Sequence, residues 1–190
     1  MINGGFILGG RTATDLGLRL KHTSERPILP ATVDRTISIA GRNGLLDFGA
    51  DVGAREFNLE CGMIYNNHIE LQTAVSKLAA YLHDPYGRPK TMKLILDSQP
   101  ERYYNVRYSG SLPIDRIAGF GEFTLPLIGF DPYAYKLDET IINATITQSP
   151  WDSRAESSGT VVTPTLIELM NRGTETINNF TLQVEYLLEG

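Results

Sequence analysis

The 190-residue sequence contains one cysteine, Cys61, and three histidines, His22, His68 and His83. A single cysteine cannot form an internal disulfide, which excludes a disulfide-stapled scaffold. The histidines are far apart, and none stands at a short metal-ligand spacing from Cys61 or from a carboxylate. We therefore predict no metal site and no cofactor. Because Cys61 lies in a strand pattern without a nearby histidine, we expect a small buried side chain rather than a nucleophile.

The sequence also lacks long apolar runs and an excess of positive charge. No run approaches the length of about 18 residues that a membrane helix needs, and the first residues lack the features of a secretory signal. We therefore expect a soluble chain without membrane insertion. Through residue 138, fifteen Lys and Arg balance fifteen Asp and Glu, whereas from residue 139 onward the numbers are two and seven. This balance argues against a surface that grips nucleic-acid phosphates, and the shift predicts two domains, residues 1–138 and 139–190.

Recognisable catalytic motifs are missing as well. Neither AGRNG nor GFGEF continues into the Lys-Ser/Thr pair that completes a phosphate-binding loop. Glu56 and Glu60 share one face of a predicted strand, but nothing marks them as an acid–base couple. The sequence therefore predicts that the protein is not an enzyme.

One helix is predicted over residues 68–83. Asn67 and Glu70 form a pair typical of a capping box, and Leu71 and Leu78 belong to an apolar stripe at helical spacing. The helix is expected to end before the Asp-Pro step at residues 84–85. Its apolar stripe predicts that it covers a sheet.

The rest of the first domain alternates apolar and polar residues with the period of half-buried strands. Pro126 in one of these segments suggests an edge strand or a bulge. The resulting fold class is mainly β, a β-sandwich or barrel-like domain with one α-helix, followed by a small or truncated all-β part. Strands are predicted within residues 6–8, 36–39, 56–61, 92–96, 104–108, 123–127, 142–146, 167–169 and 180–188.

The segment from residue 35 to 60 contains the most informative feature. Two alternating limbs, 36–39 and 56–61, flank about sixteen Gly-rich residues without a helix pattern. A connection of this length suggests an active-site lid, a binding loop or an arm that becomes ordered against a partner. A lid is not expected, because no catalytic groups lie near this segment in the sequence. The alternating limbs at its two ends favour a projecting β-hairpin. Such a hairpin would extend about 25 Å.

Other residues are candidates for an interface or a sugar site. Tyr and Arg dominate interface hot spots, so Arg102, Tyr103 and Arg107 are interface candidates, with an ordinary Tyr-lined sheet as the alternative. Trp151 is a weak candidate for a sugar-stacking platform.

The order of several motifs resembles one known family. The run SIAGRNGLLDFGADVGAREFNLECGM is preceded by ERPILP and followed by a helix and DPYGRPKTMKLILD, and FGEFTLPLIGFDPYAYK comes later. Together these segments resemble the N-terminal domain of the distal tail protein (Dit) family of long-tailed, siphovirus-type bacteriophages, over about residues 1–136. The second part, residues 139–190, departs from the family pattern, because it resembles only the start, or a reduced relative, of a galectin-like or carbohydrate-binding-module-like domain.

The resemblance implies a structural virion protein of the phage tail tip or baseplate, assembled in the host bacterial cytoplasm. Six copies would form a ring that joins the tail tube protein to the tail-associated lysin or other tail-tip proteins, and to a receptor-binding protein in some family members. Genomic DNA would pass through the lumen without specific binding. The arm would embrace the neighbouring subunit, with glycines for its turns and arginines for polar anchoring. The inter-subunit arm would comprise Gly41, Arg42, Asn43, Gly44, Asp47, Phe48, Gly49, Gly53 and Arg55.

A second function remains open from the sequence. The chain could instead be a carbohydrate-binding module for host-surface recognition, with Trp151 and exposed tyrosines as platforms. Selective glycan binding by a monomer would favour that alternative.

Overall fold

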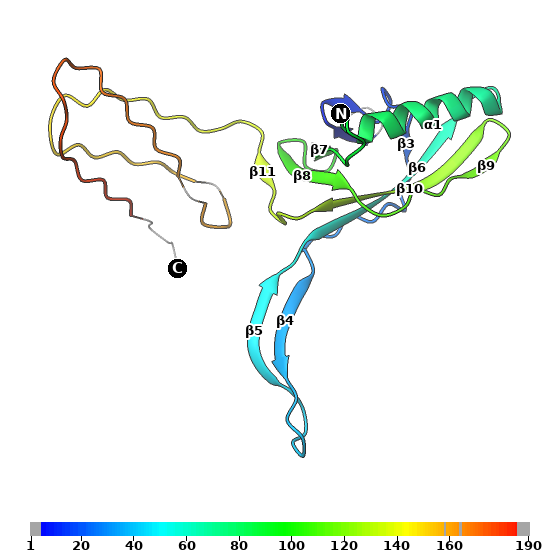
Figure 1. Cartoon of the computed structure of the whole chain (residues 1–190), viewed down its shortest axis with the longest axis horizontal. Helices are drawn as coiled ribbons and strands as arrows, with labels where there is room; N and C mark the ends of the chain where they lie inside the picture. Colours follow the sequence, from blue (N-terminus) through cyan, green and yellow to red (C-terminus); the bar gives the residue numbers. More distant parts are fainter. Residues whose placement is uncertain (1–4, 158, 164, 186–190) are drawn as a thin grey trace. The chain divides into compact units, whose positions relative to one another are not determined.

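A computed structural model describes residues 5–157, 159–163 and 165–185, and the chain divides into two compact units, Met1–Thr140 and Ile141–Gly190. The first unit holds a curled antiparallel sheet, one helix and a separate two-stranded sheet (Figure 1). The mainly β fold class predicted from the sequence is confirmed.

Nine strands form the main sheet, in the order β2-β1-β7-β8-β10-β6-β3, with β11 beside β8 and β9 beside β10. Every pair is antiparallel. The strands at the ends and branches of the sheet, β2, β3, β9 and β11, have only two or three residues each. The strands are β1 Phe6–Leu8, β2 Arg11–Thr12, β3 Arg19–Leu20, β6 Arg55–Ile64, β7 Met92–Leu96, β8 Arg102–Tyr108, β9 Asp115–Ile117, β10 Phe120–Gly129 and β11 Tyr135–Lys136.

The longest pairing joins β6 and β10, which align over ten residue pairs from Arg55↔Gly129 to Ile64↔Phe120. Alternate residues of both strands point into one core, as the period of two predicts. Phe57 and Leu59 of β6 are buried there opposite Leu127 and Leu125 of β10. Cys61 belongs to the same buried row, so its predicted packing role is confirmed.

The helix α1 spans His68–Leu82 and begins where the sequence predicts. The Asn67 side chain accepts hydrogen bonds from the backbone amides of Ile69 and Glu70, at 3.0 and 2.9 Å. Leu71 and Leu78 are buried against the sheet, which α1 covers as expected. No helix among the described residues has the length and hydropathy needed to cross a membrane.

Pro126 lies inside the sheet, in β10 between β8 and β6, rather than in an edge strand or at a recorded bulge. Proline is tolerated here because Asn58, the residue opposite it on β6, forms no backbone hydrogen bond with Pro126. The amide and carbonyl of Asn58 bond instead to Glu25, on the side of β6 that faces away from β10. The missing amide of Pro126 therefore faces the side where β8 has just ended, and Ser109 donates to its carbonyl at 3.2 Å. The site is an edge locally, although the strand is central.

The second unit has no helix or strand among its described residues, 141–157, 159–163 and 165–185, and all of these residues are exposed. The strands predicted at 142–146 and 167–169 are therefore not formed, nor is the described part of 180–188. Tyr186 and Leu188 of that last alternation lie outside the described residues. An alternating sequence needs a neighbouring strand before it forms a stable sheet, and the described residues of this unit supply none.

Candidate assembly interface

The two-stranded sheet projects from the first unit as an arm, defined here as residues 32–52 (Figure 1). Its strands are β4, Thr32–Ile37, and β5, Leu46–Val52. At its base, the Gly53 amide donates to the Ala31 carbonyl at 2.7 Å. A Cβ atom on Gly53 would lie 3.1 Å from that oxygen, so this narrow neck favours glycine.

The pairing of the arm differs from the sequence prediction. The predicted limbs were 36–39 and 56–61, but β4 pairs with β5, and residues 56–61 belong to β6 of the main sheet. No strand was predicted within the Gly-rich segment, yet seven of its residues form β5. Its alternation is broken by an irregularity in the register, at which Phe48 and Gly49 of β5 both fall opposite Arg35.

Three glycines of the arm occupy left-handed backbone conformations. Gly41 and Gly44 have φ angles of 80° and 85° in the tip that joins the strands, and Gly49 has a φ of 92° at the irregularity. The Gly49 amide also donates to Asp47 Oδ1 at 2.8 Å. A side chain at these positions would strain the backbone, which explains why glycine recurs along this segment.

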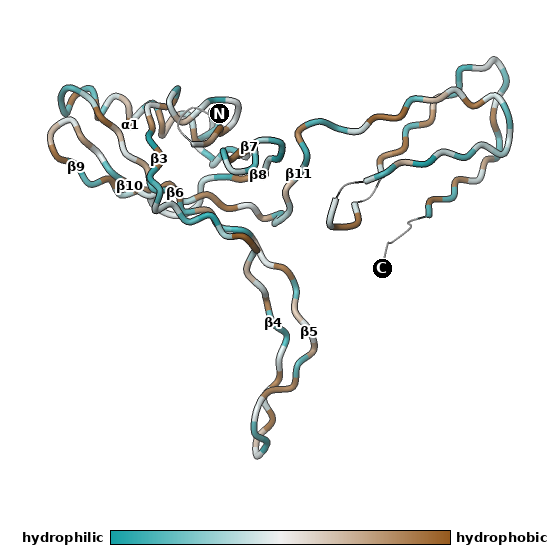
Figure 2. The backbone as a smooth tube through the Cα atoms, turned by 180° about the vertical axis from the view of Figure 1, so that it is seen from behind, coloured by the Kyte–Doolittle hydropathy of each residue, from teal (hydrophilic) through white to brown (hydrophobic). Residues whose placement is uncertain are grey.

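The surface of the arm is unusually apolar for a free hairpin. Every residue from 31 to 52 is exposed except the half-buried Leu46, and Figure 2 shows hydrophobic segments along both strands. An isolated two-stranded hairpin is at best marginally stable in water, and grouped exposed apolar side chains mark interaction sites. The arm therefore has the composition of a surface that another molecule covers. Its large apolar side chains, with exposed fractions from 46% to 64%, are Val33, Ile37, Ile39, Leu45, Phe48 and Val52.

The charged residues of the arm fall into two groups. Arg35 donates to Asp51 across the strands, and because both side chains are largely exposed this pair contributes little stability. Asp34, Arg42 and Asp47 form no ion pair with any other described residue. They are available to a partner.

The structure separates Arg55 from the other arm candidates. Gly41, Arg42, Asn43 and Gly44 lie in the tip, while Asp47, Phe48 and Gly49 lie in β5. Arg55 is the first residue of β6, half-buried at the base of the arm. Its guanidinium donates to the Tyr104 hydroxyl at 3.0 Å and lies 5.1 Å from the centre of that ring.

Two of the three candidates on β8 already have partners within the same unit. Tyr103 stacks on Tyr135 of β11, with ring centres 5.7 Å apart, and the Lys93 ammonium lies 4.1 Å from the Tyr103 ring centre. Arg107 lies over the Phe130 ring at 4.6 Å, and Arg102 is exposed. These contacts favour the Tyr-lined-sheet alternative for Tyr103 and leave Arg102 and Arg107 accessible. Trp151 lies in the second unit, whose described residues form no strand.

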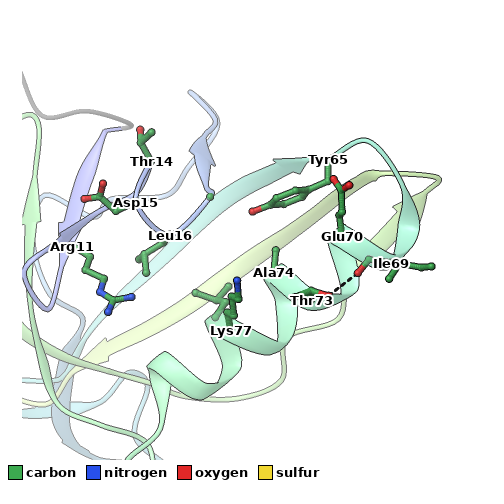
Figure 3. A pocket seen from close by; sticks show the side chains of 12 residues that line it. Arg11, Thr14, Asp15, Leu16, Tyr65, Ile69, Glu70, Thr73, Ala74 and Lys77 are labelled. Carbon is green, nitrogen blue, oxygen red and sulfur yellow. Dashed lines mark hydrogen bonds between the residues drawn. The ribbon is translucent and has the colours of Figure 1, made fainter.

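A shallow groove of about 510 Å³ lies between α1 and the turn that follows β2 (Figure 3). Its charged groups serve local structure. Asp15 accepts hydrogen bonds from the Thr12 hydroxyl and amide, which hold the pKa of that carboxyl below its usual value. Glu70 accepts from Asn66 and Asn67 at the start of the helix. The groove presents no nucleophile beside a base, and no cluster suited to a metal ion occurs among the described residues.

Sequence reasoning missed two features of this region. β5 was hidden because an irregular register and Gly49 break the period of two. Arg55 gathers Arg26, Gln99 and Tyr104 around a small pocket at the neck of the arm. Residues so far apart in the sequence carry no local signal for such a cluster.

The chain was compared with known proteins. A sequence model of the family described as phage tail protein RIFT-related domain matches residues 11–128. No curated protein matches the chain. Among solved structures, the chain is similar to the SPP1 Dit (gp 19.1) protein, described as a paradigm of the hub adsorption apparatus in phages that infect Gram-positive bacteria. The TM-score is 0.59 at 20% identity, over 70% of this chain and 51% of that one.

The chain thus spans about half the length of that solved protein. At this identity the likeness establishes a shared fold, while the family match covers most of the main sheet, the arm and α1. The Dit resemblance inferred from the sequence is confirmed by both, and the chain belongs to the family of phage tail RIFT-related domains.

Proposed function

We propose that the protein is a structural component of the distal end of a phage tail, built from several copies of this chain, most simply a hexameric ring. The observation that carries the proposal is the arm. A two-stranded sheet with exposed apolar side chains extends from a tail-family domain whose own core is complete. Contact with another copy would bury these side chains and stabilise the hairpin.

In such a ring each copy gives its arm to one neighbour and receives an arm from the other. This contact is heterologous, so its rotation must close to give a ring instead of a filament. The residues proposed to meet the neighbour are those of the tip and of β5, with Arg42 as a polar anchor. Arg102 and Arg107 on β8 are proposed as a second, smaller interface.

The ring would connect the tail tube to the proteins of the tail tip and allow DNA to pass through its lumen. The location would be the virion, after assembly in the bacterial cytoplasm. We propose no catalytic role. Carbohydrate binding remains a lesser alternative, because Trp151 is 42% exposed but lines neither the groove beside α1 nor the small pocket at the base of the arm.

Deletion of the arm tests the proposal. Residues 33–51 are replaced by Asn-Gly, which joins the paired residues Thr32 and Val52 through a two-residue turn. The expected product is a folded monomer, because the core residues lie outside the arm. The oligomeric mass of the intact and shortened chains is measured by analytical ultracentrifugation.

A matched control exchanges Ile117, an exposed residue of β9, for threonine and should assemble like the intact chain. If the shortened chain still forms the same oligomer, the arm is not the assembly element. If the intact chain is a monomer that selectively binds glycans on an array, carbohydrate recognition replaces assembly as the proposed function.

A further inference from the structure

A small pocket, called here the neck pocket, lies where the arm leaves the main sheet. Its volume is about 160 Å³, below the range of about 300–1,000 Å³ typical of small-molecule sites, so it fits a single side chain better than a free ligand. The pocket is lined by Arg26, Pro27, Ile28, Arg55, Phe57, Leu96, Ser98, Gln99 and Tyr104.

The neck pocket is lined by one positive charge, that of Arg55, that no carboxylate of the described residues pairs with. Two guanidinium groups, of Arg26 and Arg55, line it, and no lining residue is acidic. Arg26 forms an ion pair with Asp97 at 2.8 Å, outside the lining. The Tyr104 hydroxyl donates to Gln99 Oε1 at 3.1 Å and accepts from Arg55. Arg55 forms no ion pair with any other described residue. The site therefore favours an anionic group.

One donor in the neck pocket has no partner. Arg55 Nε is the sole buried side-chain nitrogen or oxygen atom in the described part of the chain that makes no hydrogen bond. An unsatisfied buried donor is costly, and the cost is larger on a charged group. The Arg55 guanidinium forms no ion pair with any other described residue, so it suits an incoming carboxylate.

The rim of the neck pocket is apolar and exposed. Ile28 has an exposed fraction of 91%, and Leu29 beside it has one of 76%. A fitting partner therefore places a carboxylate next to an apolar side chain. The arm offers this pair at Asp47 and Phe48, where Asp47 has no ion-pair partner and Phe48 is 61% exposed.

The other arm carboxylates fit less well. Asp51 is paired with Arg35, and Asp34 is followed directly by Arg35. Asp51 would have to break its ion pair with Arg35 before its carboxylate could bind in the pocket.

We propose that the neck pocket binds the Asp47 carboxylate on the arm of a second copy, while Phe48 of that copy packs on Ile28 and Leu29. This inference rests on the proposed function, since it names the surface that receives the arm. Each copy thus offers both halves of the contact, Asp47 with Phe48 in β5 and the neck pocket at the base of the arm, as a head-to-tail ring requires.

Cysteine cross-linking tests the contact directly in the full chain. The native Cys61 is fully buried, so introduced cysteines are the reactive ones. Chains with Ile28→Cys are mixed with chains carrying Phe48→Cys, and disulfide-linked dimers are measured on non-reducing gels. The expected result is a dimer from this mixture and none from Ile28→Cys mixed with Ile117→Cys, a control at another exposed isoleucine.

Oligomers that form without the 28–48 cross-link overturn this inference and leave the proposed function standing. Equal cross-linking in the control mixture also overturns it. An intact chain that does not self-associate overturns both.

A double-mutant cycle gives the second measurement. Asp47→Asn and Arg55→Gln are each expected to weaken association about tenfold or more, and together no more than the larger single effect, because they break one shared contact. Asp34→Asn is the matched control and should combine additively with Arg55→Gln. Asp47 is exposed on the arm, so its exchange tests the contact even where loss of Arg55 disturbs the fold. No effect of Asp47→Asn on association contradicts the inference.

Discussion

Cys61 illustrates how the position of a residue in the fold determines its chemical reactivity. It lies on the buried face of β6, and burial raises the pKa of its thiol to about 12. Since the thiolate is the reactive form, the native thiol should be inert at pH 8.

We therefore expect Cys61 to react with a colorimetric thiol reagent only after unfolding in urea. The control Ser98→Cys, at an exposed position, should react at once with one equivalent of reagent. The raised pKa also means that the folded state disfavours the charged thiolate. The protonated Cys61 thiol therefore contributes fully to the free energy of unfolding below the pKa of the unfolded state, near 9. This contribution is lost as the pH rises toward 12. Rapid labelling of the native protein would show that β6 is not buried as described.

At the scale of elements, α1 was predictable because its signals are local. The Asn67 cap, the apolar stripe and the stop before Pro85 all lie within one stretch of sequence. The strands of the main sheet were predictable for the same reason. In β6, for example, the alternation of apolar and polar residues is enough to assign Phe57 and Leu59 to the buried face.

The presence of a projecting hairpin was predictable from the sequence, but the pairing of its two strands was not. Its glycines and length indicated a projecting hairpin, whereas the identity of the second strand depended on an irregular register that the sequence does not display. The neck pocket was beyond prediction, because Arg26, Arg55 and Tyr104 meet only through the pairing of distant strands.

The exposed face of the arm leads to a prediction about β4. Ile37→Thr keeps a β-branched side chain but removes apolar surface, so the free energy of unfolding should change by no more than about 0.5 kcal/mol. Association should weaken, because this side chain would be buried against a neighbour. Sedimentation velocity measures association, and urea unfolding measures stability.

Ile117→Thr in β9 provides the matched comparison, since this side chain is also exposed but lies outside the arm. If both exchanges weaken association equally, the effect does not belong to the arm.

At the scale of the whole molecule, the two units differ in how they are stabilised. All members of the buried core lie between Phe6 and Leu127, and the described residues beyond 140 are exposed. We expect a chain that ends at Thr140 to unfold at the same temperature as the full chain, as measured by circular dichroism.

A shorter chain that ends at Phe130 is the control. It lacks β11, including Tyr135 stacked on Tyr103, and should unfold at a lower temperature. A lower unfolding temperature for the chain ending at Thr140 would mean that the second unit stabilises the first.

The short strands at the ends and branches of the main sheet have a consequence for the time before assembly. An unpaired strand edge is a template on which further chains can add, and two or three residues offer a poor template. The arm, with strands of six and seven residues, is the long open edge of the described chain. In the proposed assembly, a newly made copy would therefore have little tendency to aggregate through its main sheet, and premature strand pairing would involve mainly the arm.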